Sequence, residues 1–145
     1  MAEAYLDTSV LIKLYVAETS STEVERFVGE ADGIVISRLS TLEWHCAMAR
    51  RARTGQITQD YLNLARTEFT RHLAEGYFRI VPYDDPLLSD ALRVLDSASP
   101  VPLRTLDAIH LTAVRNAGVT RIATADDVMR CAAHQLQLDV AYFGD

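Results

Sequence analysis

The chain alternates short apolar runs, rich in β-branched and aromatic residues, with longer stretches in which apolar residues recur every three or four positions. The short runs are typical of buried strands, and the longer spacing is typical of helices. Strands that alternate with helices predict a parallel sheet, because each connecting helix packs back onto a face of the sheet. We therefore expect a three-layer α/β/α domain with a central parallel sheet, formed by residues 1–145 as one unit.

The two kinds of segment define an expected order of elements. The predicted strands are Ala4–Leu6, Ile34–Ile36, Phe78–Val81, Arg121–Thr124 and Val140–Phe143. The predicted helices are Leu39–Arg53, Thr58–Ala74, Pro86–Ala98, Leu106–Ala117 and Asp126–Gln137. The fourth helix is apolar nearly all round, so we expect it to be central and buried.

Helical spacing also predicts which side chains face the core. The expected buried rows are Leu39, Leu42, Cys46 and Ala49; then Leu62, Ala65, Phe69 and Leu73; then Leu88, Ala91 (or Leu92) and Leu95. The cysteines, Cys46 and Cys131, are far apart and have no C-x-x-C partner, which argues against a disulfide framework or a zinc knuckle. We expect both to be small buried hydrophobic residues.

Charge and the N-terminal segment exclude several classes of protein. With 20 acidic and 14 basic residues the net charge is −6, so a general basic coat for nucleic acid is absent. The basic residues are 13 Arg and one Lys, and Arg suits phosphate recognition, so we expect basic residues at the rim of a site. Asp7 and Lys13 interrupt the first apolar run, which has no basic start. We therefore expect no signal peptide, no membrane segment and a cytoplasmic location.

Four acidic residues lie where a parallel sheet would bring them to one edge. Asp7 and Asp126 each follow a predicted strand, and Glu43 and Asp107 lie in the first turns of predicted helices. In open α/β sheets, sites form outside the carboxyl ends of the strands. Asp7 and Asp126 also have a simpler explanation as helix caps, and Ser40 with Glu43 fits a capping box.

Asp107 is the most informative of the four. Its helical neighbours four and seven residues on are Leu111 and Val114, which places the carboxylate on the buried stripe of a buried helix. Such a position is costly unless the carboxylate is paired, capped or bound to a metal. The helix dipole favours Asp in a first turn and offsets part of that cost.

Carboxylates that meet at one edge of the sheet would repel one another and raise some pKa values. Bound Mg²⁺ or Mn²⁺ removes that conflict, because hard divalent cations take oxygen ligands. Such a site is also suited to phosphodiester hydrolysis, since the metal activates water and stabilises charge on the phosphate. Thr8, Ser9 and Thr124 are expected supporting hydroxyls, and Arg104 is a candidate contact for a phosphate or a carboxylate.

Four motifs in a fixed order carry a resemblance to a known family: Tyr5–Leu14 (YLDTSVLIKL), Ser40-x-x-Glu43, Leu103–Leu111 (LRTLDAIHL) and Thr124-Ala125-Asp126. They resemble those of PIN-domain ribonucleases and, more narrowly, of the VapC toxins of bacterial toxin–antitoxin modules. The similarity runs from Ala4 to about Val140. It implies a metal-dependent endoribonuclease in which one or two Mg²⁺ or Mn²⁺ ions are held by Asp7, Glu43, Asp107 and Asp126.

The resemblance also implies partners. Such proteins form homodimers through helices, cleave structured RNA (often transfer RNA) and are neutralised by a VapB-type antitoxin whose tail occupies the cleft. Promoter DNA is then contacted through the antitoxin. Asp127 stands beside the fourth acidic position, and we prefer Asp126 because it follows Thr124 by two residues, as in the family pattern.

Three other functions have discriminating features. A haloacid-dehalogenase-type phosphatase needs a second Asp two residues after the first, where this chain has Ser9. A phosphate-receiver domain needs a Lys after its last strand, and the only lysine is Lys13. The third alternative is an inactive PIN-like scaffold that binds RNA or a protein without cleaving, which a cleavage measurement distinguishes from an enzyme.

Two further features have a structural interpretation that we favour. His110 lies three residues after Asp107 on a buried helix, and we expect a hydrogen-bonded core histidine rather than a general base. Arg50, Arg51 and Arg53 form the densest basic run. We expect a solvated helix end there, with contact to RNA phosphates as the alternative.

Overall fold

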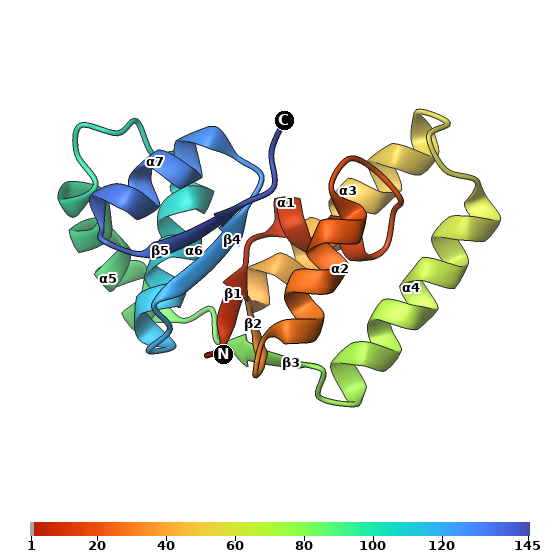
Figure 1. Cartoon of the computed structure of the whole chain (residues 1–145), viewed down its shortest axis with the longest axis horizontal. Coiled ribbons are helices and arrows are strands. Elements are labelled where there is room, and N and C mark those ends of the chain that lie inside the picture. Colours follow the sequence, from red (N-terminus) through yellow and green to blue (C-terminus); the bar gives the residue numbers. More distant parts are fainter. Residues whose placement is uncertain (1) are drawn as a thin grey trace.

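The computed structural model describes residues 2–145. Within this range five strands form one sheet, and their bounds are β1 Ala4–Leu6, β2 Ile34–Ser37, β3 Phe78–Val81, β4 Arg121–Thr124 and β5 Asp139–Tyr142. All neighbouring strands pair in parallel, in the order β3-β2-β1-β4-β5 (Figure 1). The predicted parallel sheet is confirmed, with strand ends shifted by one residue in β2 and β5.

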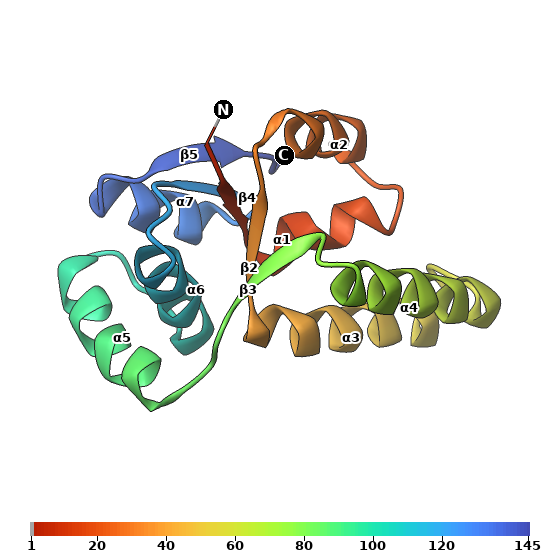
Figure 2. The same ribbon diagram turned by 90° about the horizontal axis from the view of Figure 1, so that it is seen from below.

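Helices cover both faces of this sheet. Within residues 2–145 they are α1 Thr8–Leu11, α2 Ser21–Glu30, α3 Arg38–Arg53, α4 Gln59–Ala74, α5 Asp85–Ser97, α6 Thr105–Asn116 and α7 Asp127–Gln135. A short 3-10 turn, Ile12–Leu14, extends α1. Figure 2 shows α1–α4 on one side of the strands and α5–α7 on the other, so the predicted three-layer fold is confirmed.

The alternation of side chains along the strands divides the core in two. Ala4 and Leu6 of β1 pack with α1–α4, whereas Tyr5 between them packs with α5–α7. Trp44 and Phe69 stack in the first of these cores, with ring centroids 4.2 Å apart, and so join α3 to α4. The strand period of two therefore anchors both helical layers to one sheet.

Two predicted buried rows are wrong. In α3 the buried side chains are Ser40, Trp44 and Met48, so Cys46 is exposed. In α5 the buried side chains are Leu87 and Val94, followed by the buried C-cap Ala98, and the leucines at positions 88, 92 and 95 are exposed. Both helices carry apolar residues on two faces, so spacing alone does not say which face meets the sheet.

The expectation for the second cysteine is also wrong, because Cys131 in α7 is exposed. In contrast, the α4 row is confirmed: Leu62, Ala65 and Phe69 are buried, and Leu73 is partly buried against the same core. The central helix α6 is also buried as expected, from Asp107 to Val114. Helices α1 and α2 lie in a region for which the spacing predicts no element.

The strand order positions a functional site. From β1 the chain builds β2 and β3 on one side, and then β4 and β5 on the other. The junction between β1 and β4 is thus a topological switch point, where open α/β sheets leave a crevice at the carboxyl ends of the strands. No helix in the described range 2–145 has the length and hydropathy of a bilayer-spanning segment.

Candidate active site

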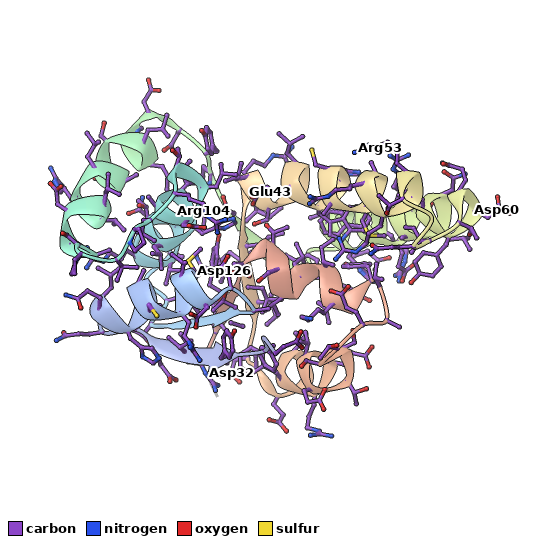
Figure 3. The ribbon with its side chains drawn as sticks, turned by 90° about the horizontal axis from the view of Figure 1, so that it is seen from above. Asp32, Glu43, Arg53, Asp60, Arg104 and Asp126 are labelled. Carbon is purple, nitrogen blue, oxygen red and sulfur yellow. The ribbon has the colours of Figure 1, made fainter. Side chains whose placement is uncertain are left out.

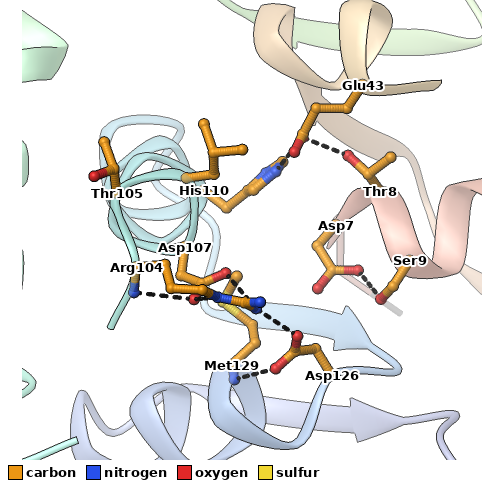
Figure 4. A pocket seen from close by; sticks show the side chains of 11 residues that line it. Asp7, Thr8, Ser9, Glu43, Arg104, Thr105, Asp107, His110, Asp126 and Met129 are labelled. Atoms are coloured by element: carbon orange, nitrogen blue, oxygen red, sulfur yellow. Dashed lines mark hydrogen bonds and ion pairs between the residues drawn. The ribbon is translucent and has the colours of Figure 1, made fainter. Parts of the chain in front are cut away.

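A hollow of about 420 Å³ opens at this switch point. Four carboxylates from four different segments line it together with polar side chains (Figure 4). The lining residues are Asp7, Thr8, Ser9, Glu43, Arg104, Thr105, Leu106, Asp107, His110, Asp126 and Met129. We call it the carboxylate hollow, and it brings together all four acidic residues selected from the sequence.

Asp7 comes directly after β1 and is 3% exposed. Its carboxylate caps α1 by accepting from the Val10 backbone N–H at 3.3 Å. It also accepts from the hydroxyls of Ser9 and Thr124, one on each carboxylate oxygen. Burial raises the pKa of Asp7, and the charge of His110 and these hydrogen bonds oppose that rise. The residue is therefore both a helix cap and a carboxyl group of the hollow.

The two hydroxyls that hold Asp7 are themselves oriented by the backbone that follows β4. Ser9 Oγ accepts from the Ala125 N–H at 2.9 Å, and Thr124 Oγ1 accepts from the Asp126 N–H at 3.0 Å. Each hydroxyl then points its one proton at the carboxylate. The expected supporting role of Ser9 and Thr124 thus has a defined geometry.

Glu43 reaches the hollow because it is not used as a helix cap. The capping box of α3 consists of Ser37 and Ser40, so the predicted box of Ser40 with Glu43 is wrong. Glu43 Oε1 instead accepts from Thr8 Oγ1 at 2.7 Å and lies 2.6 Å from Nε2 of His110. Burial favours a higher pKa for Glu43, but the hydrogen bond and charge of His110, with the Thr8 bond, bring it below its usual value.

His110 links Glu43 to strand β1. It is 3% exposed, and its Nδ1 lies 2.6 Å from the hydroxyl of Tyr5 in β1. If Nε2–H donates to Glu43, neutral imidazole presents Nδ1 as acceptor for Tyr5. The predicted hydrogen-bonded core histidine is confirmed, but its contact with Glu43 was missed. His110 lies three residues after Asp107, so both residues are on one helix face. This spacing is the sequence signal that places His110 beside the acidic residues.

Asp107 and Asp126 share one arginine. Arg104 Nε lies 2.9 Å from Asp107 Oδ2, and its Nη2 lies 2.8 Å from Asp126 Oδ2. The Arg104 backbone N–H also donates to Asp107, at 3.2 Å. Figure 4 shows the guanidinium crossing from α6 toward Asp126. Hydrogen bonds and the charge of Asp107 raise the pKa of Arg104, with smaller contributions from Asp126.

The two adjacent aspartates at the start of α7 point to different places. Asp126 caps the helix by accepting from the Met129 N–H at 3.0 Å and lines the hollow. Asp127 is exposed and pairs with Arg130 one turn along. The geometry therefore favours Asp126, as the sequence pattern did.

A second hollow of about 690 Å³ adjoins the first and shares Thr8, Ser9, Glu43 and Leu106 with it. Lys13, Arg50 and Arg51 also line it. We call it the neighbouring hollow, and its rim agrees with the expectation of basic residues beside the site.

The arginines of the basic run differ in their contacts. Arg51 pairs with Glu18 at 3.2 Å, and Lys13 Nζ lies 3.7 Å from the same carboxylate. Arg50 has no ion pair within residues 2–145. Arg53 lies at the far end of α3, away from Glu43 (Figure 3).

The chemistry of the carboxylate hollow fits a divalent cation. Among residues 2–145, no group of three or more His, Cys, Asp or Glu side chains is already arranged to hold a metal ion. Mg²⁺ does not need one, because it commonly binds through one or two carboxylates and keeps several waters. The acidic donors are all oxygen, Asp7 is a buried carboxylate, and a cationic side chain already spans Asp107 and Asp126.

Comparison with known proteins identifies relatives that cover most of the chain. Residues 4–134 match the PIN domain family. Ribonuclease VapC46 of Mycobacterium tuberculosis is 36% identical in an alignment of 145 positions that covers 97% of each protein. Ribonuclease VapC47 of the same species is 33% identical over 113 residues, covering 75% of this chain and 72% of the relative.

Solved structures share the fold at low sequence identity. VapC20 of M. tuberculosis, described as a toxin that cleaves the sarcin–ricin loop, has a TM-score of 0.69 at 15% identity and covers 89% of this chain and 94% of its own. VapBC2 of Rickettsia felis, bound to a DNA fragment from its promoter, has a TM-score of 0.65 at 9% identity, covering 97% and 98%.

Proposed function

Because this chain belongs to the PIN-domain family and, within it, to the VapC-type ribonucleases, we propose that it is a metal-dependent endoribonuclease and the toxin of a toxin–antitoxin pair. Its reaction is the hydrolysis of RNA phosphodiester bonds at the carboxylate hollow. The observation that carries the proposal is the convergence of four carboxylates from four segments on one hollow.

Asp7, Glu43, Asp107 and Asp126 are the residues that would hold Mg²⁺ or Mn²⁺. When bound, the metal supplies Lewis-acid activation of water and neutralises charge on the phosphate. The chain's own side chains hold the carboxylate oxygens in position. Ser9 and Thr124 each donate a hydrogen bond to Asp7, and Thr8 donates one to Glu43. These bonds hold two carboxylates in one orientation before substrate arrives, which is the geometric requirement for an efficient site.

His110 acts on Glu43 from the other side. Its Nε2–H donates to Glu43 Oε1 while Tyr5 holds its Nδ1. The imidazole lies behind the carboxylate, so we assign it a positioning role. Outer partners of this kind commonly change metal affinity or activity by about 10- to 100-fold.

RNA is the substrate class that the site's surroundings favour. Arg104 places a planar donor group at the mouth of the hollow, and such groups match phosphate oxygens. The neighbouring hollow continues from the first and carries Lys13, Arg50 and Arg51, so a strand extending from the cleaved bond would meet basic side chains. Transfer RNA is our first candidate target, because the family resemblance implies it.

The proposed partners follow from the relatives. The VapBC2 complex of Rickettsia felis is bound to a DNA fragment from its promoter, which supports a VapB-type antitoxin for this chain and contact with DNA through that partner. A homodimer formed through helices and a cytoplasmic location complete the proposal.

Cleavage of a bulk RNA pool tests the function. Protein purified free of any partner is incubated with Mg²⁺ or Mn²⁺, with EDTA, and as the Asp7→Asn variant. We expect cleavage with metal and its loss in the other two conditions. Cleavage that persists in EDTA would overturn metal dependence.

The alternative, an inactive scaffold, predicts a different pattern. Well-folded, metal-loaded protein would then bind RNA in a mobility-shift assay without cutting any species in the pool. Circular dichroism of the same samples confirms the fold, so that unfolding is not mistaken for inactivity.

A further inference from the structure

Arg104 occupies the same carboxylate oxygens that the proposed metal would need. It donates to both oxygens of Asp107, at 2.9 and 3.3 Å, and to Oδ2 of Asp126 at 2.8 Å. The remaining oxygen of Asp126 accepts from the Met129 N–H. A metal ion that approached these carboxylates closely would meet the guanidinium first, so the two cations compete for one position.

The side chain of Arg104 is more exposed to solvent than those of its two partners. Its side chain is 67% exposed, whereas those of Asp107 and Asp126 are 8% and 31% exposed. Ion pairs with so exposed a partner contribute little to stability. The backbone N–H of Arg104, by contrast, makes the capping bond to Asp107 and does not depend on the side chain. The guanidinium can therefore swing out while α6 keeps its first turn.

An arginine released at this place has a second partner within reach. It lines the hollow in which the RNA phosphate is cleaved under the proposed function. A guanidinium carries five donors and matches phosphate geometry. The substrate phosphate can therefore become the partner of Arg104 once Asp107 and Asp126 bind the metal.

From these contacts we infer that Arg104 is an exchangeable counterion: it neutralises Asp107 and Asp126 in the metal-free protein, yields them to the divalent cation, and then binds the substrate phosphate. The inference rests on the proposed function. It makes metal binding and RNA binding mutually favourable, because each removes Arg104 from a competing contact, and such coupling is reciprocal.

Metal affinity without RNA is the first test. Mn²⁺ binding is measured by electron paramagnetic resonance for the wild type, Arg104→Ala, Arg104→Lys and the control Arg130→Ala. The control removes an arginine from Asp127, next to Asp126 but outside the hollow. We expect Arg104→Ala to tighten Mn²⁺ binding by about 3- to 10-fold, Arg104→Lys by less, and the control to leave it unchanged. Unchanged or weaker binding in Arg104→Ala would overturn the competition.

RNA affinity is the second test. Anisotropy of a labelled single-stranded RNA is measured in EDTA and in Ca²⁺, with gels to confirm that the RNA stays intact. We expect Ca²⁺ to strengthen RNA binding by the wild type at least threefold more than by Arg104→Ala. Equal effects of Ca²⁺ on the two proteins would overturn the exchange.

The two proposals fail in different ways. A wild type that binds no Mn²⁺ and cleaves no RNA refutes the proposed function. A wild type that does both, with Arg104→Ala unaltered in metal and RNA binding, refutes only the exchange. Thermal unfolding of each variant confirms that α6 is intact.

Discussion

The carboxylate hollow contains two pairs of carboxylates that are held in different ways. Asp7 and Glu43 form a hydroxyl-held pair, fixed by the side chains of Ser9, Thr124 and Thr8. Asp107 and Asp126 form an arginine-held pair, bridged by Arg104. Hydroxyls within the fold fix the first pair, together with the His110 imidazole at Glu43, and one exposed guanidinium fixes the second.

This difference separates a permanent part of the site from an exchangeable part. The hydroxyls have no charge to compete with a metal, and the backbone after β4 orients two of them. They can keep their bonds when a cation arrives. The guanidinium must leave, because it is itself the cation. We therefore expect substitutions in the hydroxyl-held pair to have the larger effects on the proposed metal site.

The largest effect is expected for Asp7→Asn. The amide loses the negative charge while keeping the cap of α1, because Asn caps a helix as well as Asp. We expect cleavage to fall by more than about 100-fold. We expect the free energy of unfolding to fall by about 1 to 3 kcal/mol, because the amide NH₂ replaces an oxygen that accepts from a hydroxyl. Initial rates of RNA cleavage and denaturant melts measure the two quantities.

Asp60→Asn is the matched control, because the Asp60 side chain is exposed at the start of α4, far from the hollow (Figure 3). Asp7→Asn with more than half of the wild-type rate would remove Asp7 from the metal site.

The next effect is expected at His110. Replacement by Leu removes the donor to Glu43, and we expect Mn²⁺ affinity and kcat/KM to fall by about 10- to 100-fold. Gln retains a donor near the Nε2 position and should recover part of the loss. Equal behaviour of the Leu and Gln variants would mean that His110 only fills space.

A smaller effect is expected in the arginine-held pair. Asp126→Asn keeps the cap of α7 but loses one ligand at the open side of the hollow, so cleavage should fall by about 10-fold. Asp127→Asn should stay within about twofold of the wild type, since that side chain points to Arg130. Cleavage assays on both variants decide between the neighbours; a larger loss in Asp127→Asn would reverse the assignment.

The smallest effect is expected in the neighbouring hollow. Arg50 is seven residues after Glu43, about 10 Å along α3. Arg50→Gln should weaken RNA binding by about threefold and reduce the slope of log affinity against log salt by about 1. Arg53→Gln at the far end of the helix is the control. Identical salt slopes for the two variants would restore the interpretation of a solvated helix end.

Much of the fold was predictable because its strands are short runs rich in apolar residues, and β1 and β2 are buried throughout. The predicted bounds of β1, β3 and β4 agree with the structure, although β3 contains the exposed Arg79 and β4 begins with Arg121. The orientation of α5 was not predictable, because leucines at 88, 92 and 95 compete with Leu87 and Val94 for the core. Only tertiary packing chooses between two apolar faces of one helix.

The positions of the four carboxylates were predictable, but their partners were not. Parallel topology brings the residues after β1 and β4 to one edge, whatever the side chains are. The cap of α3 by Ser37 could not be distinguished from a cap by Ser40, since both residues suit that role. The bridge from Arg104 to Asp126 joins segments 22 residues apart and depends on how α6 and α7 pack.

Diffraction from crystals soaked in Mn²⁺ tests most directly whether the carboxylate hollow is a metal site. We predict an anomalous peak about 2.1 Å from oxygens of at least two among Asp7, Glu43, Asp107 and Asp126, with the Arg104 side chain turned away from Asp107. A hollow without a peak, at a Mn²⁺ concentration at which the same protein cleaves RNA, would contradict this assignment.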